Sequence, residues 1–133
     1  MSTTTAAPKK VHMIDLHNDH KLWLNVLSFC KEEIGILEHR MEDIARRNNG
    51  AEVMAELEHF QNQYIRQREV IDELRHEVKQ HENHLEKLER ENPVASDHVL
   101  FNDHTKMRED VATFEKLYHE LKAEFMRWLA KHM

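Results

Sequence analysis

The sequence predicts an all-α fold, an up-down-up antiparallel three-helix bundle with long, coiled-coil-like helices. Only two glycines and two prolines occur in 133 residues, and 33% of the residues are charged, which is typical of long helices with short connections. Apolar residues recur with alternating spacings of three and four in three long segments. The breaks between these segments are short, and short connections place consecutive helices antiparallel.

Residues 1–10 are small and polar, and we expect a disordered tail without the apolar segment of a signal peptide. Residues 11–133 then make a single helical domain that begins with a helix over 11–47. Asn48-Asn49-Gly50 ends this helix, because glycine or asparagine suits the left-handed conformation of a helix C-cap. The predicted core positions of this helix are Met13, Leu16, His20, Trp23, Leu27, Cys30, Ile34, Leu37, Met41 and Ile44.

A second helix over 51–91 ends before Pro93, since a proline disfavours the helical conformation of the residue that precedes it. Its predicted core positions are Val53, Leu57, Phe60, Tyr64, Gln67, Ile71, Leu74, Val78, His81, Leu85 and Leu88. A third helix over 97–131 follows Ser96, a favourable N-cap. Its predicted core positions are Leu100, His104, Met107, Val111, Phe114, Tyr118, Leu121, Phe125 and Trp128.

Composition argues against several classes of protein. The formal net charge of −6 comes without a basic stripe, so we expect no nucleic-acid partner. No apolar run approaches the roughly 18 residues that span a bilayer, so we expect no membrane partner. Cys30 is the only cysteine, which rules out an internal disulfide and favours a reducing compartment, here the cytoplasm. No phosphate loop, Cys-x-x-Cys pair or Ser-His-Asp arrangement occurs, so no catalytic residue is predicted and the sequence leans against an enzyme.

Histidine is the compositional outlier, with 12 residues, and three of them occupy predicted core positions. Short turns set the register of the antiparallel helices and put Leu16, His81 and His104 in one layer. The same register puts His20 in the next layer, roughly 5 Å away. The three core histidines, one from each helix, are therefore expected to meet at one end of the rod.

Imidazole nitrogens and carboxylate oxygens are the ligands of zinc, iron and manganese, and helical bundles build such sites from inward-facing side chains. The predicted metal ligands are His20, Glu77, His81 and His104. Neighbouring polar residues could complete the ligand set or orient it, namely His17, Asp19, His84 and Asp103. The sequence therefore predicts a transition-metal site, with Zn, Fe or Mn as the cofactor.

Two other interpretations of the histidine layer stay open. A polar layer can fix the register of a helical core at a cost in stability, and then no cofactor is bound. Clustered histidines can also make a bundle respond to pH, because protonation below about pH 6 puts like charges in the core. A further polar core residue, Gln67, is interpreted as a buried amide bonded to the Tyr118 hydroxyl.

Helix 11–47 carries a second apolar stripe, about 100° round from its core positions. It consists of Leu22, Val26, Phe29 and Ile36. An exposed apolar patch of this length usually marks an interface, and the simplest partner is a second copy across a two-fold axis. The sequence thus predicts a homodimer through this helix, unless the stripe packs inside the monomer. The alternative function is a non-catalytic interaction or scaffold module, in which the core histidines serve packing or pH response.

Two segments, Asp19-His20-Lys21-Leu22 and Asp103-His104-Thr105-Lys106-Met107, resemble the acidic-His starts of helices in hemerythrin-like bundles. That family holds two irons with histidines and carboxylates among four antiparallel helices. This chain has three longer helices and lacks the family's full set of His-x-x-x-Glu, His-x-x-x-His and His-x-x-x-x-Asp motifs. No family is assigned on this basis, and no ligand role is transferred.

Overall fold

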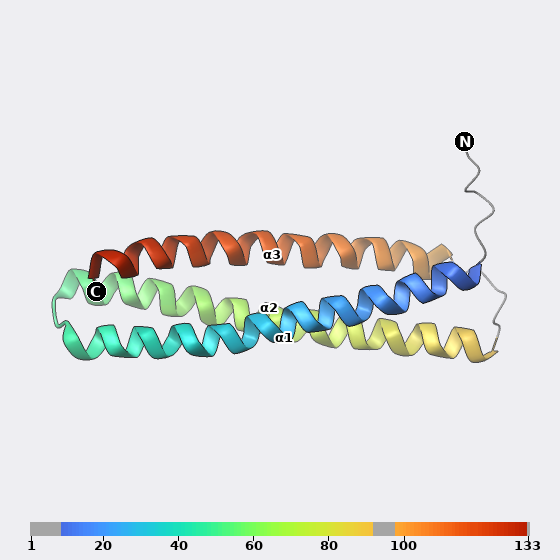
Figure 1. Cartoon of the computed structure of the whole chain (residues 1–133), viewed down its shortest axis with the longest axis horizontal. Helices are drawn as coiled ribbons and strands as arrows, with labels where there is room; N and C mark the ends of the chain where they lie inside the picture. The colour runs from blue at the N-terminus through green and yellow to red at the C-terminus, as the bar shows by residue number, and fades with distance from the viewer. Residues whose placement is uncertain (1–8, 92–97, 133) are drawn as a thin grey trace, which may run out of the picture.

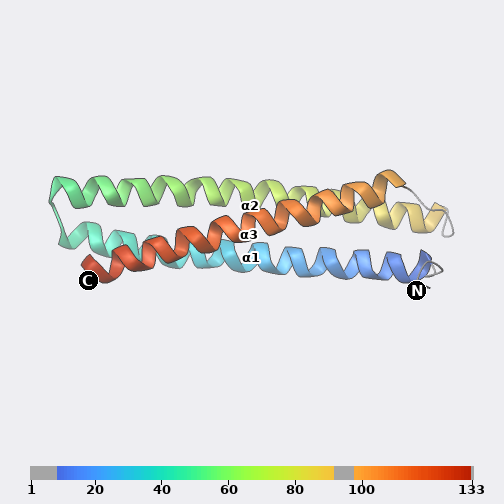
Figure 2. The same ribbon diagram turned by 90° about the horizontal axis from the view of Figure 1, so that it is seen from above.

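Three helices lie along one another as a rod in the computed structural model, which describes residues 9–91 and 98–132 (Figure 1). Helix α1 spans Lys9–Arg47, α2 spans Ala51–Glu91 and α3 spans His98–His132. Each helix runs opposite to the one before it, as the view turned by 90° also shows (Figure 2). The predicted all-α, up-down-up three-helix bundle is confirmed.

The helix boundaries agree with the predicted ranges to within two residues. Lys9 and Lys10, which the sequence assigns to the disordered tail, already belong to α1. Lysine has a good helix propensity, so two lysines extend an existing helix at little cost. The rest of the predicted tail, and the connection that contains Pro93 and Ser96, lie outside the described residues.

The turn between α1 and α2 is capped differently from the prediction. No residue of the described ranges has a positive φ, so the left-handed cap expected within Asn48-Asn49-Gly50 is wrong. The Gly50 carbonyl instead accepts the backbone N–H of Met54 at 3.0 Å, which makes Gly50 the N-cap of α2. The Asn48 side-chain amide donates to the Ile44 carbonyl at 2.9 Å and satisfies the end of α1. Because Asn48 reaches back one turn, the chain needs no left-handed residue there.

The predicted core positions form the core of the rod. Those with described side chains are buried, except for four that are half-buried, namely Trp23, Val53, Gln67 and Leu88. α1 packs chiefly against α2, and its contact with α3 is sparse. None of the three described helices combines the length and the apolar character that a membrane span requires.

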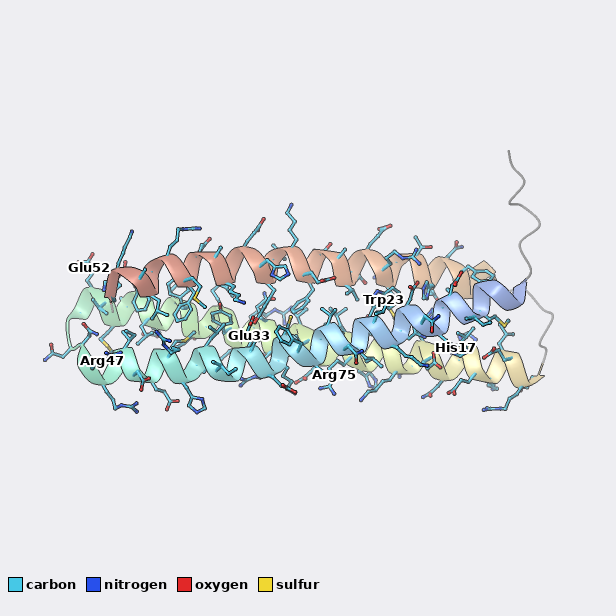
Figure 3. The ribbon with its side chains drawn as sticks, viewed as in Figure 1. His17, Trp23, Glu33, Arg47, Glu52 and Arg75 are labelled. Carbon is cyan, nitrogen blue, oxygen red and sulfur yellow. The ribbon has the colours of Figure 1, made fainter. Side chains whose placement is uncertain are left out.

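A polar cluster interrupts the core at mid-rod, centred on Glu33 of α1 (Figure 3). Tyr118 donates its hydroxyl to Glu33 at 2.7 Å, and Lys122 donates to the same carboxylate at 2.9 Å. Burial raises the pKa of Glu33, but the bonds from Lys122 and Tyr118 outweigh it and bring that pKa below its usual value. The predicted bond between Gln67 and Tyr118 is therefore wrong. The physical reason is that an ionised carboxylate is a stronger acceptor than an amide.

Candidate metal centre

One histidine from each helix meets in the core toward the end of the rod where α1 begins. His20, His81 and His104 are 1%, 8% and 2% exposed. Each offers a ring nitrogen within 4.8 Å of those of the other two. The ring centroids are 5.0, 5.1 and 5.5 Å apart. In the described parts of the chain, this is the one cluster of His, Cys, Asp or Glu side chains with such spacing, and it could hold a metal ion.

Both ring nitrogens of His20 are engaged. Its Nδ1 donates to Oε1 of Glu82 at 2.6 Å, and its Nε2 lies 3.0 Å from Nδ1 of His81. An ionised carboxylate only accepts, so in neutral His20 the proton sits on Nδ1 and Nε2 carries the lone pair. Glu82 thereby sets the tautomer of His20 and turns its basic nitrogen toward the centre of the cluster.

Asp19 orients His104 in the same way. Nε2 of His104 donates to Oδ2 of Asp19 at 2.9 Å, and Arg108 donates to that oxygen at 2.8 Å. The other nitrogen of His104, Nδ1, is buried and has no hydrogen-bond partner among the described residues. A buried lone pair of this kind costs free energy unless something binds it.

The surroundings of His104 and Asp19 determine the charge of each side chain. Burial lowers the pKa of His104 and outweighs the hydrogen bond to Asp19, so the ring is neutral at pH 7. Burial raises the pKa of Asp19, but the bonds from His104 and Arg108 outweigh it and lower that pKa. An ionised carboxylate bonded to a neutral imidazole is the arrangement that orients metal-binding histidines in proteins.

His17 supports the site from one turn further out. Its Nδ1 lies 2.7 Å from Oε2 of Glu82, and its Nε2 lies 2.5 Å from Oε1 of Glu89. Burial lowers the pKa of His17, but the carboxylates of Glu89 and Glu82 outweigh it and raise that pKa above its usual value. The His17 ring lies between the two carboxylates and holds Glu82 in place for His20.

Glu82 and Glu89 are the site residues that the sequence analysis missed. They lie seven residues apart on the flank of α2 that faces α1, the flank from which Arg68 also pairs with Glu38. These residues could have been found by counting in steps of seven along the positions of α2 that lie beside the core. The sequence analysis instead favours Glu77, one turn before His81, which lies on the flank that faces α3.

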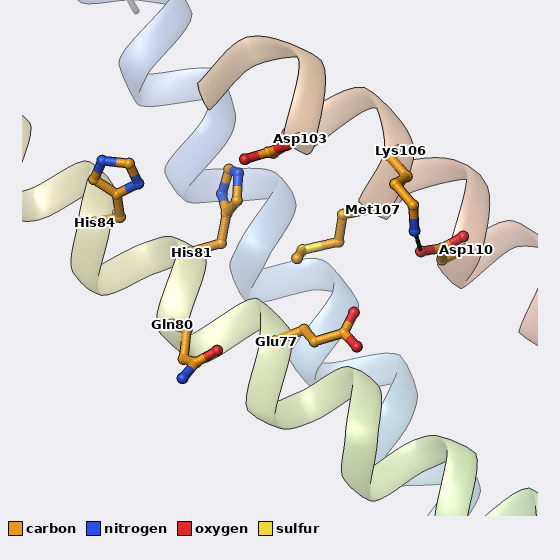
Figure 4. A pocket seen from close by; sticks show the side chains of 8 residues that line it. All are labelled: Glu77, Gln80, His81, His84, Asp103, Lys106, Met107 and Asp110. Atoms are coloured by element: carbon orange, nitrogen blue, oxygen red, sulfur yellow. Dashed lines mark hydrogen bonds and ion pairs between the residues drawn. The ribbon is translucent and has the colours of Figure 1, made fainter. Parts of the chain in front are cut away.

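Three residues of the predicted site lie where α2 faces α3. Two of them belong to α2 and one to α3. Glu77, His84 and Asp103 are exposed and line a cavity of about 290 Å³ together with His81 (Figure 4). None of the three has a ligand atom in the group that lies within 4.8 Å, which consists of His20, His81 and His104. The role of Glu77 as a ligand, and of His84 and Asp103 around it, stays a prediction.

The His20 ring lies at a different level along the rod from the one that the expected helix register gives. The sequence places it in the layer beside Val78, whereas its ring contacts His81 directly. Helical side chains lean toward the N-terminus of their own helix. Because α1 and α2 are antiparallel, the rings of His20 and His81 lean toward each other and meet between the two expected layers.

The geometry is close to that of a bound metal. Ligand nitrogens at 2.0–2.1 Å from zinc are about 3.4 Å apart in a tetrahedral site. The facing nitrogens of His20 and His81 are 3.0 Å apart, and the whole set lies within 4.8 Å. Ring movements of about 1 Å would complete the site. The Trp23 ring packs on His104 with a centroid distance of 4.7 Å and covers one side of the triad.

No protein-family model, curated protein or solved structure matches this chain. Function is therefore inferred from the geometry and chemistry of the site itself.

Proposed function

We propose that this protein is a small helical-bundle protein that binds a transition metal through His20, His81 and His104. The observation that carries the proposal is the orientation of the imidazoles. His20 and His104 each use one nitrogen to donate to a carboxylate. The second nitrogen of His20 faces His81, and the second nitrogen of His104 is buried without a partner among the described residues. This is the pattern of metal-binding histidines, in which the outer hydrogen bond fixes the tautomer and raises the basicity of the inner nitrogen.

A histidine layer that served only packing would have its buried nitrogens satisfied by hydrogen bonds, because an unpaired buried polar atom is destabilising. Nδ1 of His104 is buried and has no such partner in the described chain. A metal ion would bind this lone pair. Other buried polar atoms, such as the Tyr64 hydroxyl, also lack a hydrogen-bond partner within the described helices, but this nitrogen belongs to a group of three imidazoles, and that combination favours metal binding over the packing and pH-response interpretations.

Three imidazoles favour zinc or iron among the metals expected from the sequence, since manganese prefers oxygen ligands. Binding requires neutral rings with free lone pairs, so the hydrogen bond between His20 and His81 must break as the metal enters. Asp19 and Glu82 would keep their present bonds and hold the rings in place. Glu77, the fourth ligand that the sequence predicts, is exposed and stands outside the group of three histidines, so in our proposal the three imidazoles alone hold the ion.

The first test is metal content by mass spectrometry on protein purified without a histidine tag, with thermal melts in the presence and absence of a chelator. We expect near one metal per chain. A ligand at 1,000 times its Kd stabilises the fold by about 4 kcal/mol, so chelation should lower Tm by on the order of 10 °C. His81→Ala should lose both the metal and the effect of the chelator.

His39→Ala is the matched control, because His39 is an exposed histidine of α1 far along the rod from the triad. It should keep the metal and the response to chelator. A metal-free protein whose melting is unchanged by added zinc or iron would refute the proposal.

We propose the cytoplasm as the compartment. Cys30 is buried, and burial raises the pKa of its thiol to about 11, so it is a core residue and not a nucleophile. A lone free thiol fits a reducing environment.

A second candidate function is an interaction module that forms a homodimer through α1. Leu22, Phe29 and Ile36 are 60%, 62% and 64% exposed and lie seven residues apart, whereas Val26 packs partly against the core. A two-fold axis through Phe29 superposes this evenly spaced row on itself and pairs Leu22 with Ile36. Such self-complementarity is what a symmetric dimer interface requires.

Sedimentation velocity tests this candidate. We expect a dimer for the natural chain and a monomer for Phe29→Ser. Leu117→Ser, which changes an exposed leucine of α3, should stay dimeric. A monomeric natural chain at the highest soluble concentration would refute dimerisation and leave the metal proposal untouched.

A further inference from the structure

A cavity of about 290 Å³ lies between α2 and α3 directly beside the histidine triad (Figure 4). His81 forms part of its wall, and the buried Met107 of α3 lines it next to the layer of His104. Methionine is unbranched and flexible, so it can move aside at little cost. The cavity therefore offers a path from solvent to the triad.

The other sides of the triad are occupied. Trp23 packs against His104, and Glu82 with His17 occupies the side between α1 and α2. Asp19 and Glu82 already bond the outer nitrogens of His104 and His20, so neither is available as a ligand without giving up that role. The α2–α3 cavity is therefore the side from which a further ligand can approach the triad.

Structural zinc sites are closed by four protein ligands, whereas three protein ligands leave one position for an exchangeable molecule. The triad supplies three. We propose that a metal held by the triad keeps one coordination position open toward the α2–α3 cavity, and that this position takes small neutral donor molecules in preference to anions. This inference rests on the proposed metal binding.

The preference for neutral donors follows from the charges around the cavity. Lys106 donates to Asp110 at 2.8 Å, and this bond and the charge of Asp110 raise the pKa of the lysine. The charges of Glu77 and Asp103 also raise that pKa. One lysine thus stands against three carboxylates. Glu77 and Asp103 are exposed carboxylates that form no ion pair with any described residue. The wall of the cavity therefore carries more negative than positive charge, which weakens the attraction of an anion to the metal and leaves the binding of a neutral donor unaffected.

Cobalt(II) is a suitable probe, because its visible absorption reports the number and type of its ligands. The full chain is loaded with cobalt and titrated with imidazole and, separately, with azide at about pH 8, where imidazole is neutral. Low ionic strength keeps the charges unscreened. We expect both molecules to change the cobalt spectrum. In the double variant Glu77→Gln, Asp103→Asn, azide should bind about tenfold more tightly and imidazole with unchanged affinity.

The matched control is Glu120→Gln, Glu124→Gln, which removes the same charge from exposed positions of α3 away from the cavity. It should bind azide as the natural chain does. Equal effects of the two double variants on azide would refute the charge preference.

The remaining outcomes separate this inference from the proposed function. If cobalt does not bind, metal binding itself fails. If cobalt binds and neither molecule changes its spectrum, the site is closed and the open position is refuted, while metal binding stands. If Glu77→Gln alone lowers cobalt affinity by tenfold or more, Glu77 fills the fourth position, which also refutes the open site.

Discussion

Two layers of three packed rings lie near opposite ends of this rod. At one end the ring centroids of His20, His81 and His104 are 5.0–5.5 Å apart. At the other end the ring centroids of Phe60, Phe125 and Trp128 are 5.2–5.9 Å apart. The spacing is nearly the same, so the two layers differ in chemistry more than in packing.

The aromatic layer is stabilised by burial of apolar surface, and its single polar atom, Nε1 of Trp128, donates to Glu56 at 3.1 Å. The histidine layer gives up hydration of six ring nitrogens and needs Asp19 and Glu82 to offset part of that cost. The layer of Phe60, Phe125 and Trp128 shows that this core accommodates largely apolar aromatic rings at the same spacing. Costly polar residues in a position that apolar ones could fill are typical of a functional site.

The largest expected effect contrasts the two layers directly. Phe125→Ala should destabilise the fold by about 3–5 kcal/mol, because it removes a fully buried ring and leaves a cavity. His104→Phe keeps a ring and removes the buried nitrogens, so in the presence of chelator it should change stability by less than about 1.5 kcal/mol. Urea unfolding measures both. A cost for His104→Phe as large as that of Phe125→Ala would mean that the histidine layer is required for folding.

The next effect concerns the carboxylates that accept a hydrogen bond from each layer. Asp19→Asn keeps the shape of the side chain but removes the charge that makes His104 more basic, and should weaken metal binding by about 10–100-fold. Glu56→Gln makes the same change beside Trp128 and should leave metal affinity unchanged. Competition with a coloured chelator measures both affinities. Equal affinities in the two variants would exclude an orienting role for Asp19.

A smaller effect is the pH dependence of the histidine end, measured with chelator present. The raised pKa of His17, beside Glu82 and Glu89, means that protonation stabilises the fold below pH 6.5, and this contribution is lost as pH rises through the folded-state pKa. The lowered pKa of His104, which faces Asp19, His20 and Arg108, has the opposite sign. Its contribution is complete above pH 6.5 and is lost as pH falls toward its folded-state pKa.

Stability should therefore fall more steeply between about pH 7.5 and 5.5 in His17→Gln than in the natural chain, and less steeply in His104→Gln. Urea unfolding at a series of pH values gives the three slopes. Parallel curves for all three proteins would show that neither ring titrates differently on folding.

The smallest effect is expected at Gly35, which lies in the C-terminal half of α1, away from the histidine layer. A Cβ built there meets nothing within 4 Å, so the monomer offers no reason for a glycine. Gly35→Ala should stabilise the fold by about 0.5–1 kcal/mol through the lower flexibility of the unfolded chain. Metal affinity should not change. Destabilisation would indicate that another molecule approaches α1 closely at Gly35.

Most of the fold was predictable, and for a physical reason. The alternation of apolar residues at spacings of three and four specifies which face of each helix is buried, and it does so whatever the neighbouring helix contributes. The turn at Asn48 and Gly50 was placed correctly for the same reason, since the pattern stops there. Its capping was not predictable, because a side chain such as that of Asn48 can replace a left-handed residue.

The sequence by itself determined that three histidines, one from each helix, converge at one end of the core. Helix period and short connections suffice for that, because together they set both the buried face and the level along the rod. It also determined the candidate partners Asp19 and His17, since neighbours in sequence stay neighbours on a helix.

Only the tertiary structure decided which atoms meet. The lean of His20 and His81 toward each other, the bonds from Glu82 to His17 and His20, and the buried lone pair of His104 depend on how neighbouring helices face and on side-chain rotamers. Composition and spacing carry no information about these variables. A periodic pattern specifies faces and levels to within about half a heptad, whereas metal coordination depends on tenths of an ångström.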